Sequence, residues 1–138
     1  MSFRETSAWI TLLSVLVCFG VYFGSLITGA VAAPSFATLH LLLLCVTGLV
    51  ILQIGLHALA ARLTPKDARA PRDEREMLIQ IRAQALGYYV LMAGVLALAI
   101  PGHLDFSTID LLNFALLALV VAALVVSAAQ IIMFRRGA

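Results

Sequence analysis

Four long apolar runs dominate this chain and limit what it can fold into. They lie at about residues 8–28, 36–61, 77–100 and 109–134. Each run is long enough to cross the hydrocarbon core of a bilayer, which takes about 20 apolar residues in a helix. Because the chain is 63% hydrophobic and only 12% charged, it has no polar coat for a water-facing surface. Lipid is therefore the expected solvent for most of the molecule.

The runs indicate helices rather than strands. Helices and closed barrels are the structures that satisfy every backbone polar group in lipid, and barrel strands alternate apolar and polar residues. The stretch "LHLLLLCVTGLVILQIGLHALAA" (39–61) does not alternate. We therefore expect an all-α fold, a four-helix transmembrane bundle, with residues 1–138 forming a single integral membrane domain.

The positive charges predict how the chain is threaded. Lys and Arg occur only near the N-terminus, from the end of the second run to the start of the third, and at the C-terminus: Arg4, Arg62, Lys66, Arg69, Arg72, Arg75, Arg82, Arg135 and Arg136. An even number of spans places all three regions on one side, and short loops rich in Lys and Arg stay cytoplasmic. Both termini are expected in the cytoplasm. These short juxtamembrane stretches form no basic domain, so we expect the lipid bilayer and not nucleic acid as a partner.

The first run has one alternative interpretation, which is a cleavable signal peptide. The small residues "AVAA" (30–33) precede Pro34 and resemble a cleavage site. The run itself spans about 21 residues, which is longer than the usual apolar region of a signal peptide. We therefore expect a retained transmembrane helix.

The charged segment before the third run is the candidate partner surface. Its residues are Arg72, Asp73, Glu74, Arg75 and Glu76. Asp73 and Glu76 have the spacing of a helix N-terminal cap, in which side chains accept free backbone N–H groups. Arg72 and Glu76 are four residues apart and can pair. A capped, solvated helix start explains these residues as well as a cytoplasmic partner or metal site does.

The two halves of the chain resemble each other. "GVYF" (20–23) is similar to "GYYV" (87–90), and "LQIGLH" (52–57) is similar to "AQIIMF" (129–134). A duplicated helical hairpin would relate the halves by an axis along the membrane normal and would make Gln53 and Gln130 equivalent. Chance similarity between short apolar motifs is the alternative.

Polar residues inside the runs form the candidate intramembrane site: Gln53, His57, Asn113 and Gln130. Such residues bind a ligand or, more often, form hydrogen bonds to a neighbouring helix. Gln53 and His57 are four apart and share one helix face. No carboxylate lies in the middle of a run, which disfavours a carrier coupled to protons or cations through such a group.

A haem site is one alternative, because helical bundles can hold iron between two histidines. His40 and His57 are separated by about 25 Å along one helix, so they cannot share a metal. His103, the remaining histidine, lies in the second outer turn. Cys18 and Cys45 lack metal-site spacing and are expected to pack as small hydrophobic residues. We expect no cofactor, no metal and, since no catalytic motif is present, no enzymatic activity.

Small residues predict close helix packing. Gly20, Gly24 and Thr28 form a row on the first helix, and Ala83 and Gly87 form a shorter row on the third. Such rows let helix backbones approach closely, either within one bundle or between two copies in a homo-oligomer.

Four segments together resemble a group of small bacterial integral membrane proteins. They are "MSFRETSAWITLL" (1–13), "LQIGLHALAAR" (52–62), "PRDEREMLIQIRAQALGYYVL" (71–91) and "AQIIMFRRG" (129–137). The resemblance covers most of the chain and is most specific at the "DERE" segment. It implies a multi-pass protein of the bacterial inner membrane, commonly paired with a small helix-turn-helix regulator. The group has no established activity, so the resemblance assigns no catalytic residue.

Three functions follow as hypotheses. The first is a non-enzymatic membrane protein that acts through protein partners, as a regulatory or accessory subunit. The second is a small transporter or channel with a polar site near Gln53 and His57. The third is a haem or redox membrane protein.

Overall fold

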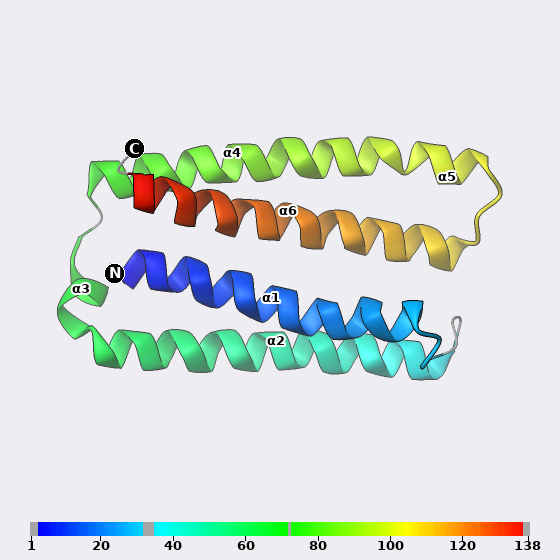
Figure 1. Ribbon diagram of the computed structural model, residues 1–138, viewed down its shortest axis with the longest axis horizontal. Helices are drawn as coiled ribbons and strands as arrows, with labels where there is room; N and C mark the ends of the chain where they lie inside the picture. Colours follow the sequence, from blue (N-terminus) through cyan, green and yellow to red (C-terminus); the bar gives the residue numbers. More distant parts are fainter. Residues whose placement is uncertain (1–2, 32–34, 72, 137–138) are drawn as a thin grey trace.

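The computed structural model describes residues 3–31, 35–71 and 73–136, and it contains four long helices (Figure 1). The long helices are α1 (Phe3–Ile27), α2 (Phe36–Leu63), α4 (Glu74–Ala97) and α6 (Thr108–Arg136), and two short helices are α3 (Pro65–Arg69) and α5 (Ala99–His103). By length and composition, the segments Phe3–Ile27, Phe36–Leu63, Glu74–His103 and Thr108–Arg136 are each able to cross a membrane. The prediction of an all-α, four-span membrane protein is confirmed.

The helix boundaries differ from the apolar runs mainly at the charged end of the molecule. α1 begins at Phe3 rather than near residue 8, so its first turn includes charged residues. α3 was not predicted, and it starts with Pro65, whose fixed φ angle suits the first position of a helix. These helical turns lie outside the apolar runs. Hydropathy marks the segment that is apolar enough for the bilayer, and a helix can continue beyond it into polar sequence.

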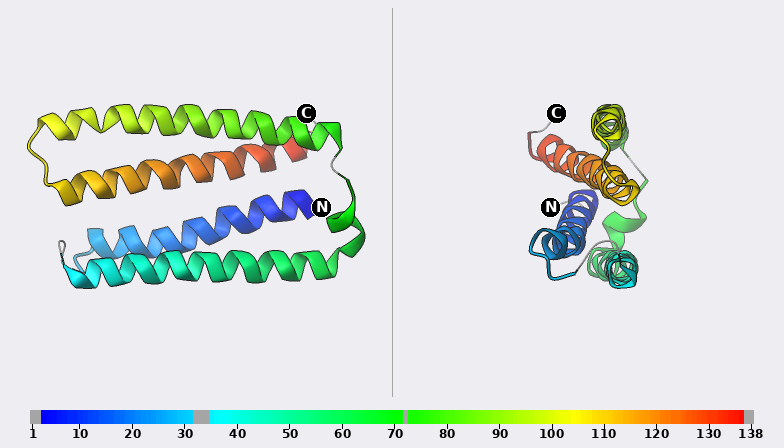
Figure 2. Two further views of the ribbon diagram at one scale, coloured as in Figure 1. Left: turned by 180° about the vertical axis from the view of Figure 1, so that it is seen from behind. Right: turned by 90° about the vertical axis from the view of Figure 1, so that its right-hand side faces the viewer.

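The four long helices lie side by side in the order α2, α1, α6, α4 (Figures 1 and 2). α1 packs against both α2 and α6, and α6 packs against both α1 and α4. α1 and α6 are therefore the inner helices, and α2 and α4 are the outer ones. The inner pair also has a larger buried share than the outer pair.

The two ends of the bundle differ in charge. Both termini and α3 lie at one end, and the turns between α1 and α2 and between α5 and α6 lie at the other (Figure 1). We call these the basic end and the turn end, because every Lys and Arg among the described residues belongs to the first and none to the second. The predicted placement of both termini on one side is thus confirmed. The turn end uses two left-handed backbone positions, at Gly29 (φ 70°) and Asp105 (φ 54°).

Two kinds of contact hold the bundle together. The middle is filled by an apolar cluster of Val15, Phe19, Tyr22, Cys45 and Val120, which joins α1, α2 and α6. Cys45 packs there as a small hydrophobic residue, as predicted.

The contact between α4 and α6 depends on glycine. Gly87 faces Val126 and the backbone oxygen of Ala122, and Gly94 faces Ala118. A Cβ atom added at Gly94 would lie 2.7 Å from the Ala118 Cβ, which is far inside van der Waals contact. The predicted close approach at Ala83 and Gly87 is confirmed, since both residues are buried.

The duplicated hairpin has a mixed outcome. α1–α2 and α4–α6 are both helical hairpins, as duplication requires. Duplication makes α1 equivalent to α4 and α2 equivalent to α6, so a symmetric pair of hairpins would match the α1–α6 contact with a contact between α4 and α2. In the described chain, however, α2 and α4 lie on opposite sides of the row. Gln53 and Gln130 accordingly lie on an outer and an inner helix. Duplication stays a prediction, without the symmetric packing that it implies.

The helix starts correct one sequence prediction. Asp73 is the N-cap residue of α4, but its side chain makes no capping hydrogen bond. The carboxylate instead lines a hollow at the basic end together with Glu5 and Glu76. Side-chain capping occurs at the turn end, where the Ser107 hydroxyl donates to Asp110 (2.7 Å) and accepts from the Asp110 backbone N–H (3.2 Å).

Candidate functional site

Two ion pairs fasten the start of α1 to its neighbours at the basic end. The Arg4 Nε lies 3.5 Å from a Glu76 carboxylate oxygen on α4. The Arg135 Nε on α6 donates to the Glu5 carboxylate at 3.3 Å. The guanidinium of Arg135 also lies 5.4 Å from the centre of the Trp9 ring, within the range of a cation–π contact. Two helices, α4 and α6, thus contact the first two turns of α1.

A small polar pocket opens beside these pairs. Its volume is about 150 Å³, and it lies among α1, α4 and α6. The lining residues are Arg4, Ser7, Glu76, Ile79, Gln80, Gln130 and Phe134. The side-chain amides of Gln80 and Gln130 make no hydrogen bond within the described residues, so both retain donors and acceptors for a polar ligand or water.

His57 connects α2 to this pocket. Its Nδ1 lies 2.7 Å from the backbone oxygen of Gln53, and its Nε2 lies 2.8 Å from the hydroxyl of Ser7, which lines the pocket. A carbonyl oxygen can only accept, so Nδ1 donates to it, and in the neutral ring Nε2 accepts the Ser7 hydroxyl hydrogen. The alternative that His57 forms a hydrogen bond to a neighbouring helix is confirmed.

The four predicted intramembrane residues do not form one site. Gln130 and, through Ser7, His57 belong to the basic end. Asn113 lies near the turn end, where its Oδ1 accepts a hydrogen bond from the Tyr22 hydroxyl at 2.8 Å. Gln53 contributes its backbone oxygen to His57 and does not line the pocket. The apolar cluster of Val15, Phe19 and Val120 separates the two groups.

The predicted partner surface borders two hollows. One, of about 290 Å³, is lined by Glu5, Asp73, Arg75, Glu76 and Phe134. The other, of about 410 Å³, is lined by Asp73, Glu74, Arg75, Leu78, Ile79, Arg82 and Met133. Asp73 and Arg75 border both hollows. Arg72, the fifth residue of the predicted surface, lies outside the described residues.

The structure adds residues that the sequence did not single out. Glu5 and Ser7 complete the hollow and the pocket, and Gln80 supplies the second amide. Each of these residues meets the others through packing between helices that are far apart in the chain, so no local sequence motif predicts them. The one available signal is spacing, because Arg4 and Ser7 are three apart on one helix face.

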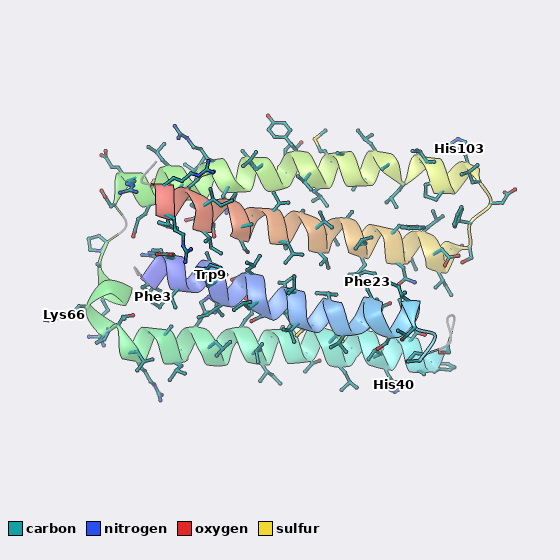
Figure 3. The ribbon with its side chains drawn as sticks, viewed as in Figure 1. Phe3, Trp9, Phe23, His40, Lys66 and His103 are labelled. Atoms are coloured by element: carbon teal, nitrogen blue, oxygen red, sulfur yellow. The ribbon has the colours of Figure 1, made fainter. Side chains whose placement is uncertain are left out.

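The histidines are spread over the molecule. His40 lies on α2 and His103 on α5, at opposite edges of the row (Figure 3). Each donates a hydrogen bond through Nδ1 to the backbone oxygen of the residue four positions earlier in its own helix. Within the part of the chain that the structure describes, no three His, Cys, Asp or Glu side chains gather as metal ligands. A paired-histidine haem site therefore has no geometric support from these residues.

Comparisons of the chain with protein-family models, with curated proteins and with solved structures find no match. The site is thus described by its own geometry: a basic end with a charged surface, two hollows and one polar pocket.

Proposed function

We propose that this is a non-enzymatic membrane protein that acts through a protein partner, which docks on the charged surface of the basic end. The observation that carries the proposal is the Asp73 carboxylate. It stands at the N-cap position of α4 without forming the cap bond, and it lines a hollow with Glu5 and Glu76. A carboxylate that does not stabilise its own helix is available to a cationic side chain of a partner.

The surface is held ready for docking. The Arg4–Glu76 and Glu5–Arg135 pairs connect α1 to α4 and α6, so the carboxylates of the hollow, which belong to α1 and the start of α4, are held by contacts among three helices. Groups that are already ordered lose less conformational entropy on binding. Glu74 and Arg75 are exposed beside them and extend the surface along α4.

The location of the protein is part of the proposal. Because short loops rich in Lys and Arg remain inside, we place the basic end in the cytoplasm and the protein in the bacterial inner membrane. The partner would then be a cytoplasmic protein or the cytoplasmic part of another membrane protein. The family resemblance makes a small helix-turn-helix regulator the first candidate, with this protein as its regulatory or accessory subunit.

The test is site-specific photo-cross-linking in intact cells. A photoreactive residue at Glu74 should yield one discrete adduct, and Asp73→Asn should reduce that adduct. A photoreactive residue at Leu104, at the turn end, should not give the same adduct. Equal labelling from both positions, or an adduct that is indifferent to Asp73→Asn, would contradict the proposal.

The transporter hypothesis has one observation in its favour, which is the polar pocket with Gln80 and Gln130. Transport also needs a polar path to the opposite side, and the cluster of Val15, Phe19 and Val120 lies between the pocket and Asn113. Flux into proteoliposomes that disappears with Gln130→Leu would favour transport over docking.

A further inference from the structure

The outward face of α4 has a composition that lipid does not explain. Tyr88 and Tyr89 are 60% and 67% exposed, and Gln84, one turn before Tyr88, is exposed as well. The two tyrosine rings touch edge to face, with centroids 5.8 Å apart. Within the described residues, these three side chains form no hydrogen bond.

These tyrosines lie at the middle of the membrane-crossing segment. The span runs from Glu74 to His103, so Tyr88 and Tyr89 are each about 21 Å from the nearer end at a rise of 1.5 Å per residue. Half the hydrocarbon core is only about 15 Å. With the bilayer centred on this span, Tyr88 and Tyr89 are placed within the hydrocarbon, whereas tyrosines that face lipid normally occur at the membrane–water interfaces.

An unpaired hydroxyl or amide in hydrocarbon is unfavourable by several kcal/mol on transfer scales that lack hydrogen bonding. Acyl chains offer neither donors nor acceptors. The exposed groups thus need a protein partner at the same depth. Aromatic residues and methionine are also enriched in protein interfaces.

The exposed residues form a seam suited to another helix. Their spacing of three and four residues places them along one side of α4. The seam consists of Ile81, Gln84, Ala85, Tyr88, Met92 and Val95, all exposed, and Tyr89 lies at its border, edge to face with Tyr88. Ala85, near its middle, leaves room for a close approach.

We propose that this seam packs against the same seam of a second copy of the chain, about a two-fold axis along the membrane normal. The nine Lys and Arg residues all belong to the basic end, so every copy inserts in the same direction. Two α4 helices in contact therefore run parallel, and each seam residue meets its own equivalent at the same depth. Glutamine amides and tyrosine hydroxyls both donate and accept, so each can pair with a copy of itself.

This dimer goes beyond the proposed function but is compatible with it. α4 starts at Glu74, so the dimer would bring two charged surfaces to the same side of the membrane. The two proposals fail separately. Loss of the docking partner by Asp73→Asn should leave dimerisation unchanged, because Asp73 precedes α4 and is not part of the seam.

Cysteine cross-linking in native membranes tests the seam. Cys18 and Cys45 are first replaced by alanine, and helicity is checked by circular dichroism. Gln84→Cys and Tyr88→Cys should each give a covalent dimer on mild oxidation. Ile51→Cys is the matched control, since Ile51 is 66% exposed at the middle of the outer helix α2. Equal dimer formation at Ile51, no dimer at either seam position, or an adduct with an unlike protein would overturn the proposal.

The hydrogen bonds are tested by dilution of labelled protein in lipid vesicles. Tyr88→Phe retains the ring and removes the hydroxyl, and Gln84→Leu removes the amide. Each should raise the dimer dissociation constant roughly three- to twenty-fold, the range that corresponds to interhelical hydrogen bonds in membranes. Thr47→Val removes an exposed hydroxyl on α2 that, unlike the Tyr88 hydroxyl, is within reach of the backbone carbonyls of its own helix, so it should leave the dissociation constant unchanged. An equal effect of Thr47→Val would contradict a specific seam.

Discussion

The two helical hairpins of this protein use their glycines in opposite ways. In the α4–α6 hairpin, Gly87 and Gly94 face α6 at distances that leave no space for a Cβ atom. In the α1–α2 hairpin, Gly20, Gly24 and the two α2 glycines have nothing within 4 Å of that position. The α4–α6 hairpin is held by close approach of the two backbones, and the α1–α2 hairpin by side-chain contacts such as the Ser7–His57 hydrogen bond.

The difference shows that glycine spacing alone does not identify a contact. The row of Gly20, Gly24 and Thr28 has the regular four-residue spacing that favours helix association. It is nevertheless open in the described chain, while Gly87 and Gly94, seven residues apart, form the contact. Whether a glycine lies in a helix contact depends on which face of the helix packs against its neighbour. α1 packs through Val15, Phe19 and Tyr22 on another face.

The largest expected effect is on the glycine-dependent hairpin. Gly94→Leu should lower the free energy of unfolding by about 3 kcal/mol, the upper part of the range for overpacking. The reason is that even the Cβ would lie 2.7 Å from the Ala118 Cβ and 3.6 Å from its Cα, so α4 and α6 must separate. Unfolding of the purified protein in mixed micelles, followed by circular dichroism, measures the change.

Gly48→Leu on α2 is the control for this comparison. Gly48 has open space at its Cβ position, so the same substitution should change stability by less than about 0.5 kcal/mol. If both substitutions destabilise equally, the two hairpins do not differ in the way described.

The next effect concerns the hydrogen bonds that hold the α1 side of the molecule. Tyr22→Phe removes the bond to Asn113 and should lower stability by about 1 kcal/mol, as expected for one interhelical hydrogen bond in a membrane. Ser7→Ala should act similarly through the loss of the His57 bond. A double-mutant cycle of Ser7→Ala with His57→Phe measures the pair directly, and a coupling energy of zero would show that the two side chains do not interact.

A smaller effect is expected at the basic end. Glu76→Gln removes the Arg4 ion pair, whose side chains are each 26% exposed, so it should lower stability by about 0.5 kcal/mol. The loss should shrink as salt is added, because salt screens partly exposed charges. Glu74→Gln is the matched control, since Glu74 is exposed and makes no ion pair within the described residues. A salt-independent loss at Glu76 would contradict an electrostatic origin.

The fold was predictable because the energy of a lipid-exposed chain depends mainly on residue type. Any run of about 20 apolar residues must become a helix, and the charge distribution then determines the threading. The order of the helices was not predictable. It depends on which faces fit one another, and the helices are apolar on nearly every side. Val15 and Leu16, for example, are equally apolar, yet one is buried and the other is 55% exposed.

The candidate site was predictable only where it lies in one segment. Asp73, Glu74, Arg75 and Glu76 are adjacent in sequence, and the structure places them around the two hollows. Glu5 joins them through packing between helices separated by about 70 residues, which no local pattern encodes. The predicted Asp73 cap was wrong: the residue stands at the N-cap position, but its side chain makes no hydrogen bond to α4 and lines the hollow.

The smallest expected effect returns to the open row on α1. Gly20→Ala adds a methyl group where nothing lies within 4 Å, and alanine favours a helix over glycine by up to about 1 kcal/mol in water. The stability of the monomer should therefore stay the same or rise slightly in micelle unfolding. Dimer formation should also be unchanged in the vesicle assay, because the proposed seam lies on α4 and not on this row. If Gly20→Ala instead weakened the dimer while Tyr88→Phe did not, the contact between copies would belong to α1. The glycines of α1 would then contact a second copy of the chain, whereas those of α4 contact α6 of the same chain.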